Sequence, residues 1–298
     1  MHSQQLDYFC KVAECGSFSR AAITIGINQS AVSRHVRNLE ESLKAQLFYR
    51  NGRGVLLTEV GKQLFDRASR ALREIAAAED DVLNSGKDVV SSVVIGMTPT
   101  VSRVLVQPMA RQLLSAFPAI KLRFVEGFSG TLVEWLDAGR IDIAILYSGR
   151  GSAGMNPELL VKERLCLVAS AKEPKLRMKT PAAFLEKVPL ILPSRTQGLR
   201  QLIEGIALEH NLKLNVIIEA DSLGSLLALV KAGLGYTILP AAPIREELAR
   251  RDVQASLLVQ PEVTRTLILA TPANRPKVRG LVQIAKVVKN EMKRFGEV

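Results

Sequence analysis

Cysteine and histidine are scarce in this chain, which excludes several kinds of protein. Three cysteines among 298 residues are too few for a disulfide framework or a four-ligand zinc site. The three histidines are scattered, and no His or Cys recurs at the spacing of metal ligands. The sequence therefore predicts a protein of a reducing compartment, with no metal site and no cofactor.

Long apolar runs are also missing. The longest stretch without a charged residue, Val89–Ser102, has 14 residues, fewer than the roughly 20 that a membrane-spanning helix needs. The N-terminal residues lack a basic region followed by an apolar core, so no secretion signal is expected. With 47% hydrophobic residues, the chain can bury the cores of two or three domains. We expect a cytoplasmic protein of several domains that contacts no membrane.

Acidic residues are outnumbered, with 29 Asp and Glu against 40 Lys and Arg and a net charge of +11. This excess favours anionic partners such as nucleic acid, phosphates or carboxylates. Residues 1–58 carry a net +3, residues 59–88 carry −2 and residues 89–298 carry +10. A solvated basic surface and an anionic small ligand both remain open for the last segment.

The first 58 residues have the pattern of three short helices. Gly16 and Gly26 end the first two helices, and Ser17 and Asn28 stand where their side chains can cap the second and third. Apolar positions on the third helix step by four, three and four residues and must face a core. They are Val32, Val36, Leu39 and Leu43.

The opposite face of the third helix is polar and basic, with Gln29, Ser30, Ser33, Arg34 and Arg37. Two short helices joined by a tight turn, the second with such a face, predict a helix-turn-helix. Gln and Arg suit base edges, whereas Ser and Arg suit phosphates. An ordinary solvated helix face is the alternative. A Gly-rich hairpin follows over residues 47–58 and places Arg50 and Arg53 at its tip as a wing.

Several segments resemble the N-terminal signature of LysR-type transcriptional regulators without a gap over about sixty residues. They are Ser17-Phe18-Ser19-Arg20-Ala21-Ala22, Gln29-Ser30-Ala31-Val32-Ser33, Leu39-Glu40, Leu47-Phe48 and Leu57-Thr58-Glu59-Val60-Gly61. Ile25 and Asn28 depart mildly, since Leu and Ser or Thr are commoner there. The resemblance implies promoter DNA and RNA polymerase as partners. The residues expected to contact DNA are Ser17, Arg20, Asn28, Gln29, Ser30, Ser33, Arg34, Arg37, Arg50 and Arg53.

A linker is predicted over residues 59–88, where Thr58 can cap a long helix and residues 85–88 form a hinge. Its apolar positions follow the a/d pattern of a coiled coil: Leu64, Ala68, Ala71, Ile75, Ala78 and Val82. A second copy of the chain is the economical partner for this seam, and packing on the chain's own domains is the alternative. The resemblance implies a dimer that commonly assembles into a tetramer.

Residues 89–298 alternate apolar runs with helical stretches, which indicates a parallel sheet with helices on both faces. The resemblance implies the two-lobed, periplasmic-binding-protein-like effector domain of the family. On that basis lobe I comprises residues 89–163 plus 267–298, and lobe II comprises residues 164–266. The expected fold is thus an all-α winged helix-turn-helix and linker helix, followed by an α/β effector domain.

Ligands of open α/β sheets bind beyond the carboxyl ends of the strands. Hydroxyls and free N–H groups at helix N-termini bind anions, and an Arg can pair bidentately with a carboxylate. We therefore predict a small anionic effector between the lobes, although capping and structural hydrogen bonds are alternative roles. The candidate residues are Thr98, Thr100, Ser129, Gly130, Thr131 and Tyr147 from lobe I, and Ser194 and Arg195 from lobe II.

Two other functions compete with a transcription regulator. A solute-binding protein of the same two-lobed fold would leave residues 1–58 unexplained and lacks a secretion signal. An α/β enzyme with an accessory DNA-binding module would need a catalytic set. No nucleophile elbow, phosphate-binding loop or paired-carboxylate motif stands out in the sequence. The sequence therefore favours a regulator without catalytic activity.

Overall fold

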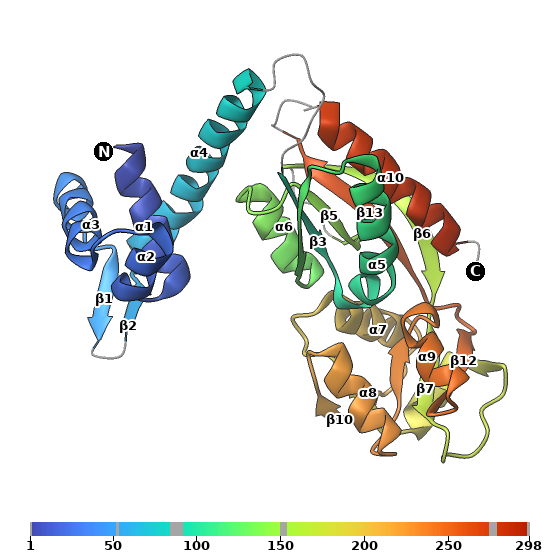
Figure 1. Cartoon of the computed structure of the whole chain (residues 1–298). Helices are drawn as coiled ribbons and strands as arrows, with labels where there is room; N and C mark the ends of the chain where they lie inside the picture. Colours follow the sequence, from blue (N-terminus) through green and yellow to red (C-terminus); the bar gives the residue numbers. More distant parts are fainter. Residues whose placement is uncertain (1, 52–53, 84–91, 150–153, 274–278, 297–298) are drawn as a thin grey trace. The chain divides into compact units, whose positions relative to one another are not determined.

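The computed structural model describes residues 2–51, 54–83, 92–149, 154–273 and 279–296 (Figure 1). The chain divides into two compact units, of which the first holds the N-terminal residues through Asp88 and the second most of the remainder. Among the described residues, no helix is long and apolar enough to cross a membrane.

The first unit contains the predicted three helices, hairpin and long helix. The elements are α1 (Ser3–Cys15), α2 (Phe18–Ile25), α3 (Gln29–Leu43), β1 (Phe48–Asn51), β2 (Gly54–Leu57) and α4 (Glu59–Leu83). Gly16 and Gly26 end α1 and α2 in left-handed conformation, with φ of 60° and 79°, as predicted. The apolar face of α3 is buried at Val32, Val36 and Leu39, but Leu43 is 38% exposed.

Two side chains join the helix-turn-helix to the wing and to α4. The Glu40 carboxylate accepts hydrogen bonds from the backbone N–H groups of Leu47 (2.8 Å) and Phe48 (3.4 Å). The Thr58 hydroxyl accepts from the N–H of Gly61 (3.0 Å) and donates to the carbonyl of Gln46 (2.8 Å). The predicted capping of α4 by Thr58 is confirmed, and Thr58 also ties α4 to the segment between α3 and β1.

Only part of the predicted seam of α4 is free in the single chain. Ala68 is buried and Leu64 half-buried against the core formed by α1, α2 and α3. Both residues therefore pack on the chain's own domain, which was the alternative to pairing with a second copy. Ala71 is exposed and Ile75 is 46% exposed. The side chains of Ala78 and Val82 lie outside the described residues.

Lobe I of the second unit is a five-stranded sheet in the order β4-β3-β5-β13-β6. Helices α5 and α10 pack on one face, and α6 packs on the other. Its elements are β3 (Ser92–Met97), α5 (Pro99–Ala116), β4 (Lys121–Glu126), α6 (Ser129–Asp137), β5 (Ile143–Tyr147), β6 (Met155–Arg164), β13 (Thr264–Pro272) and α10 (Arg279–Gly296).

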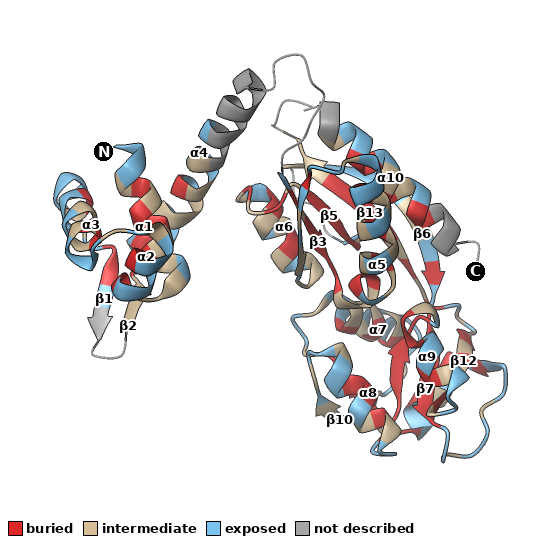
Figure 2. Ribbon diagram, viewed as in Figure 1, coloured by how far each residue is buried: buried red, intermediate tan, exposed pale blue. Residues whose placement is uncertain are grey.

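Lobe II is built on the strand order β11-β7-β12-β8, and a bridge between Leu190 and Tyr236 connects the pair β10-β9 to β11. Its elements are β7 (Cys166–Ser170), β8 (Lys179–Pro181), η1 (Ala182–Lys187), β9 (Leu190–Leu192), α7 (Gly198–Glu209), β10 (Val216–Glu219), α8 (Leu223–Lys231), β11 (Thr237–Leu239), η2 (Ala242–Ile244), α9 (Arg245–Ala249) and β12 (Val253–Val259). Buried strands form the centre of both lobes (Figure 2).

The predicted parallel sheet is in part antiparallel. β3 pairs in parallel with β4 and β5, but β13 runs antiparallel to both β5 and β6. Sequence periodicity reveals alternation but not direction, so the returning strand could not be oriented from it. The predictions also lacked β6, β8 and β12. β6 lies at the sheet edge and is largely exposed, so its sequence has no buried apolar run to mark it.

Candidate functional site

Helix α3 presents the polar face that the sequence predicts. Gln29, Ser30, Arg34 and Arg37 are exposed, and Ser33 is half-buried. Within the described part of the chain, neither Arg34 nor Arg37 has an ion-pair partner. Val32, Val36 and Leu39 are completely buried on the other side of the helix, which fixes its rotation. The two guanidinium groups are thus available to an anionic partner.

Three further residues predicted to contact DNA, Ser17, Arg20 and Asn28, belong to α2 and to the residues that precede α2 and α3. The Ser17 hydroxyl accepts a hydrogen bond from the N–H of Arg20 (3.4 Å), so Ser17 caps α2 as predicted, and the Arg20 side chain is exposed. Asn28 precedes α3, but its side chain makes no capping bond. Its backbone carbonyl instead accepts from the N–H of Ala31 (3.0 Å). The side-chain cap expected of Asn28 is therefore absent.

The predicted hairpin is present, with Phe48 opposite Leu57 and Asn51 opposite Gly54. Arg50 lies on β1, opposite Val55, but the position of its side chain is outside the described residues. Arg53 is also outside them. The structure therefore confirms the two strands of the wing, whereas the contacts of Arg50 and Arg53 with DNA stay predictions.

A cleft of about 470 Å³ lies between the two lobes of the second unit. Lobe I contributes the beginning and first turns of α5, the end of β4 and α6, and lobe II contributes the segment that leads into α8. The lining residues are Pro99, Arg103, Glu126, Gly127, Phe128, Thr131 and Trp135 from lobe I, and Asp221, Ser222, Leu223 and Gly224 from lobe II. Of the predicted effector-binding residues, Thr131 is in this set.

Sequence reasoning missed Glu126 and Asp221, although a signal for both existed. Glu126 is the last residue of β4, and Asp221 follows the end of β10 at Glu219. Both strands run parallel to their neighbours, so these residues lie at carboxyl ends, where ligands of α/β sheets bind. The sequence argument considered hydroxyls and an Arg at such positions but no carboxylate.

Thr100, Ser129 and Tyr147 meet inside lobe I rather than at the cleft lining. The Thr100 and Tyr147 hydroxyl oxygens are 3.0 Å apart, and the Ser129 hydroxyl accepts from the backbone N–H of Tyr147 (3.2 Å). Thr98 is buried before α5, with no hydrogen bond from its hydroxyl to any described residue. Gly130 is exposed at the start of α6.

A buried ion pair completes the cluster around Tyr147. Arg265 Nε donates to Glu163 Oε2 over 3.1 Å, and the two side chains are 7% and 8% exposed. Tyr147 donates to the same carboxylate oxygen (3.0 Å), while Arg265 Nη2 donates to the Thr100 hydroxyl (3.2 Å). The Arg265 guanidinium stacks on the Tyr147 ring, 3.5 Å from its centroid.

Burial raises the pKa of the Tyr147 phenol above its ordinary value. The phenol therefore keeps its proton and serves as a donor to Glu163. This cluster could not be predicted from a local motif, because Glu163 and Arg265 are 102 residues apart in the sequence. The two residues meet because β6 and β13 pair.

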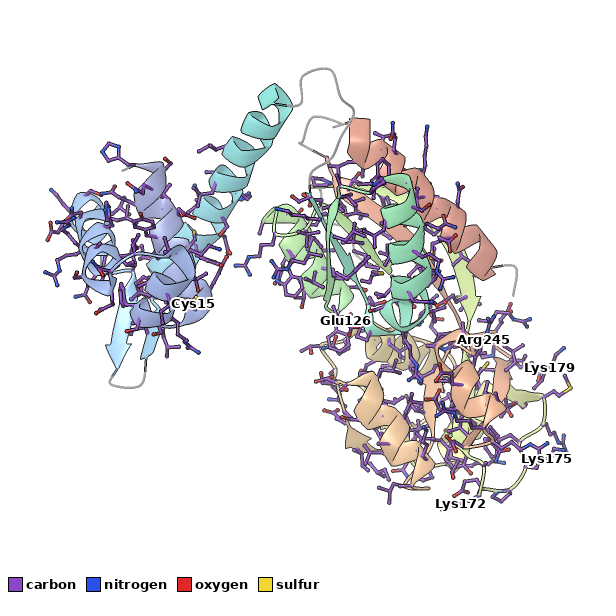
Figure 3. The ribbon with its side chains drawn as sticks, viewed as in Figure 1. Cys15, Glu126, Lys172, Lys175, Lys179 and Arg245 are labelled. Atoms are coloured by element: carbon purple, nitrogen blue, oxygen red, sulfur yellow. The ribbon has the colours of Figure 1, made fainter. Side chains whose placement is uncertain are left out.

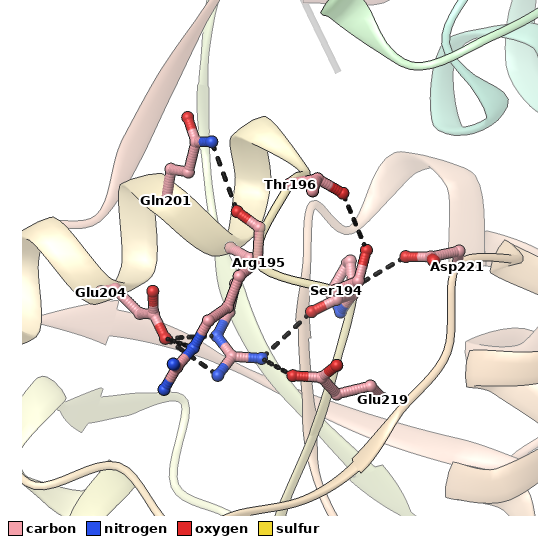
Figure 4. Close-up of polar contacts among 9 residues, drawn as sticks. Ser194, Arg195, Thr196, Gln201, Glu204, Glu219 and Asp221 are labelled. Atoms are coloured by element: carbon pink, nitrogen blue, oxygen red, sulfur yellow. Dashed lines mark hydrogen bonds and ion pairs between the residues drawn. The ribbon is translucent and has the colours of Figure 1, made fainter.

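Ser194 and Arg195 form their polar contacts with residues of their own lobe, lobe II (Figure 4). The backbone N–H of Ser194 donates to Asp221 Oδ1 (2.9 Å), and the Ser194 hydroxyl lies 3.1 Å from that of Thr196. Arg195 is 78% exposed and pairs with Glu204 of α7 at 3.3 Å. The expected convergence of Thr100, Ser129 and Arg195 is therefore not seen, because Arg195 has an acidic partner on its own lobe.

A different arginine of lobe II, Arg200, is buried. It donates to Glu204 (2.9 Å), to Glu219 (3.1 Å) and to the carbonyl of Pro193 (3.1 Å). These three bonds hold the segment after β9 against α7 and the end of β10. The buried guanidinium is fully engaged within lobe II and has a structural role.

Arg103 forms an ion pair between the lobes. Its Nη2 lies 2.5 Å from Glu247 Oε1 of α9, and Lys231 Nζ lies 3.6 Å from the same oxygen. Burial acts to raise the pKa of Glu247, but backbone and Arg103 hydrogen bonds and the charges of Arg103 and Lys231 outweigh it and lower the pKa. Glu247 therefore stays ionised and neutralises the one cation of the cleft lining.

Two of the three thiols are poor nucleophiles. Burial raises the pKa of Cys10 to about 11, and burial also raises the pKa of Cys166. Cys15 is half-buried and its sulfur lies 4.0 Å from the Thr24 hydroxyl. All three cysteines are free thiols. Among the described residues there is also no group of three or more His, Cys, Asp or Glu side chains that could hold a metal.

Two family models match the chain. One describes the LysR substrate binding domain and matches residues 87–288, and the other describes a bacterial regulatory helix-turn-helix protein of the lysR family and matches residues 3–62. The HTH-type transcriptional regulator BbuR of Bordetella bronchiseptica is 31% identical over 289 residues, which cover 97% of this chain and 89% of BbuR. The nitrogen assimilation regulatory protein nac of Escherichia coli is 30% identical over 92% of this chain and 89% of its own length.

Solved structures share the fold at lower identity. A structure of full-length CbnR complexed with its target DNA is similar with a TM-score of 0.72 and 21% identity, over 97% of this chain and 99% of that chain. A full-length OxyR variant from Pseudomonas aeruginosa is similar with a TM-score of 0.75 and 22% identity, over 98% of this chain and 95% of that one.

We expect the substitution Glu163→Gln to destabilise the second unit by about 3–5 kcal/mol, because it leaves a buried guanidinium without its carboxylate. Urea unfolding followed by circular dichroism measures the change. Lys62→Gln is the control, since it breaks an exposed pair with Glu59 that contributes about 0–1 kcal/mol. If Glu163→Gln lowered the free energy of unfolding by less than about 1 kcal/mol, the prediction that this buried ion pair stabilises the second unit would be wrong.

Alkylation of the folded protein by iodoacetamide should modify Cys15 before the other two cysteines. A thiol with a pKa of about 11 is ionised to only about one part in a thousand at pH 8, and the thiolate is the reactive form. Mass spectrometry after a time course identifies the order. In 8 M urea the three rates should converge. Equal rates for Cys10 and Cys15 in the native state would refute the burial argument.

Proposed function

The chain belongs to the LysR family of transcriptional regulators, and we propose that it reads promoter DNA with the exposed face of α3 and responds to a small molecule in the inter-lobe cleft. Members of this family bind promoter DNA and small-molecule effectors and form oligomers. They are regulators rather than enzymes, and we propose that this chain likewise has no catalytic activity. The alternative of a solute-binding protein without a transcriptional role is not favoured.

The DNA-binding proposal rests on Arg34 and Arg37, which are exposed and have no ion-pair partner among the described residues. A helix with such a face fits the major groove, where Arg and Gln can read base edges. We assign base contacts to Gln29 and Arg34, and phosphate contacts to Ser30, Ser33 and Arg37. Flanking contacts with the DNA backbone are assigned to Ser17, Arg20, Asn28, Arg50 and Arg53.

We propose that only part of the predicted apolar seam of α4 pairs with a second copy of the chain. Because Leu64 and Ala68 pack on the first unit, we assign pairing with a second copy to the positions from Ala71 onward. Among the seam positions from Ala71 onward, Ile75 is the large apolar residue whose exposure is described, whereas Leu72, between them, packs on the core of the first unit. We propose a dimer formed through α4 that assembles into a tetramer, and RNA polymerase as the partner of the assembled regulator.

An anionic group of the effector would find its partners at helix N-termini. The first residues of α5 and α8 line the cleft from opposite lobes, and Phe128 and Thr131 place the start of α6 beside them. Free N–H groups and helix dipoles at such ends stabilise negative charge. This arrangement supports the predicted anion without Arg195, which we assign to supporting α7 through Glu204.

Replacing Arg34 by Ala should weaken binding to a DNA fragment from the gene's own upstream region. A lost base contact costs about 1–3 kcal/mol on the specific fragment alone. A lost phosphate contact instead weakens binding on all sequences and reduces the slope of log K against log salt by about 0.9. Gel shifts at several salt concentrations separate the two cases.

Arg245→Ala is the matched control for this experiment, since it removes an exposed cation from α9 in the second unit. It should leave specific binding of the upstream fragment unchanged. Unaltered binding by a folded Arg34→Ala protein would remove Arg34 from the DNA-contacting surface.

Ile75→Asp should dissociate the oligomer. An ion placed in an apolar seam without a partner costs several kcal/mol when it is fully buried. Sedimentation velocity should then detect monomers, or misassembled species, at concentrations where the wild type is oligomeric. Ile23→Asp, at an 81% exposed position of α2, should sediment as the wild type does. A wild-type oligomer in Ile75→Asp would locate the interface elsewhere.

A further inference from the structure

We infer that the inter-lobe cleft takes a zwitterionic small molecule, one that carries a protonated amine as well as an anionic group and an apolar side chain. This inference rests on the proposed effector-binding function of the cleft and names the chemical class of its ligand. Its volume of about 470 Å³ lies in the range of about 300–1,000 Å³ that is usual for ligand pockets.

Carboxylates supply the uncompensated charge of the lining. Glu126 stands at the end of β4 on the lobe I side (Figure 3), and among the described residues it has no ion-pair or hydrogen-bond partner for its side chain. Asp221 faces the cleft from lobe II and accepts one hydrogen bond, from the backbone N–H of Ser194. That bond orients the Asp221 carboxylate and leaves its second oxygen to a ligand.

The single cation of the lining does not balance these two acids. Arg103 already pairs with Glu247, which is itself buried and ionised. A purely anionic ligand would therefore share the cleft with two carboxylates that the lining's Arg103 does not balance. The lining holds two acids and one base, so the net +10 of residues 89–298 does not gather at this site.

The remaining lining residues suit both ends of a zwitterion. An ammonium group can bind Glu126 and Asp221, and the rings of Phe128 and Trp135 offer apolar surface that also attracts cations. The N-terminal turn of α8 receives the anionic end, together with the dipole of α5, whose first residue Pro99 has no N–H. A ligand that lacks the amine would leave the two carboxylates without a partner, and a ligand that lacks the anionic group would leave the helix N-termini without one.

The test is isothermal titration calorimetry of the full chain with four matched probes. They are phenylalanine, N-acetylphenylalanine, phenethylamine and 3-phenylpropionate, followed by the other apolar α-amino acids. We expect binding of α-amino acids at least about tenfold tighter than of the three relatives that lack one charge, the lower end for a hydrogen bond to a charged group. Equal or tighter binding of the N-acetyl derivative or the carboxylate overturns the inference, and so does binding by none of the probes.

Variants then tie the affinity to the two carboxylates. Glu126→Gln and Asp221→Asn should each weaken binding of the amino acid about tenfold or more, with little effect on 3-phenylpropionate. Glu209→Gln, an exposed carboxylate at the end of α7, is the control and should bind as the wild type does. Unchanged affinity in both cleft variants would place the amine elsewhere and overturn the inference.

A blocking variant separates this inference from the proposed function. A Cβ on Gly224 would contact only the Ser222 hydroxyl, at 3.6 Å, so Gly224→Leu can be accommodated and fills part of the cleft. It should abolish binding of every probe while gel shifts on the upstream DNA remain normal. If a singly charged acid binds the wild type and Gly224→Leu blocks it, the effector site stands and only the zwitterion is refuted. If the amino acid binds Gly224→Leu normally, the cleft is not the site.

Discussion

The antiparallel return of β13 into the first sheet of the effector domain is the constraint on which the second unit depends. β13 inserts between β5 and β6, and its register places Arg265 opposite Glu163 and Leu267 opposite Tyr147. The chain thus leaves lobe I along β6 and comes back along the neighbouring strand. The buried contacts of Arg265 with Glu163, Tyr147 and Thr100 then connect β13, β6, β5 and α5 at the end of the sheet nearest to the crossing.

That cluster also explains why several polar residues near the strand ends are unavailable for a ligand. Thr100 and Tyr147 bind each other and the ion pair, and Ser129 accepts from the Tyr147 backbone. Buried polar groups require such partners, because an unpaired one costs about 1–3 kcal/mol. The cleft is consequently lined by the residues beyond these positions, Pro99, Phe128 and Thr131, together with the entry to α8.

In the first unit, short-range contacts connect α3 to the rest of the domain. Core positions of α3 fix its rotation, and Glu40 binds the strand that begins the wing. Thr58 then caps α4 while donating to the carbonyl of Gln46, and a Cβ on Gly61 would come within 2.2 Å of the Leu47 carbonyl oxygen. Contacts among Leu39-Glu40, Leu47-Phe48 and the residues from Thr58 to Gly61 therefore hold α3, the wing and α4 together.

Periodicity and capping are local signals, so the sequence alone was enough to predict the helices and hairpin of the first unit, the polar face of α3 and the alternation of strands and helices after residue 91. The caps at Gly16, Ser17, Gly26 and Thr58 could be predicted in the same way, but the side-chain cap expected of Asn28 is absent. Only the tertiary structure decided the direction of β13, the pairing of Arg265 with Glu163, the assignment of Leu64 and Ala68 to their own domain and the acidic lining of the cleft. Each of these depends on which distant segment lies opposite. Arg195 illustrates the difference: its position after a strand could be read from the sequence, but its partner, Glu204, is set by the rotation of α7 against that strand.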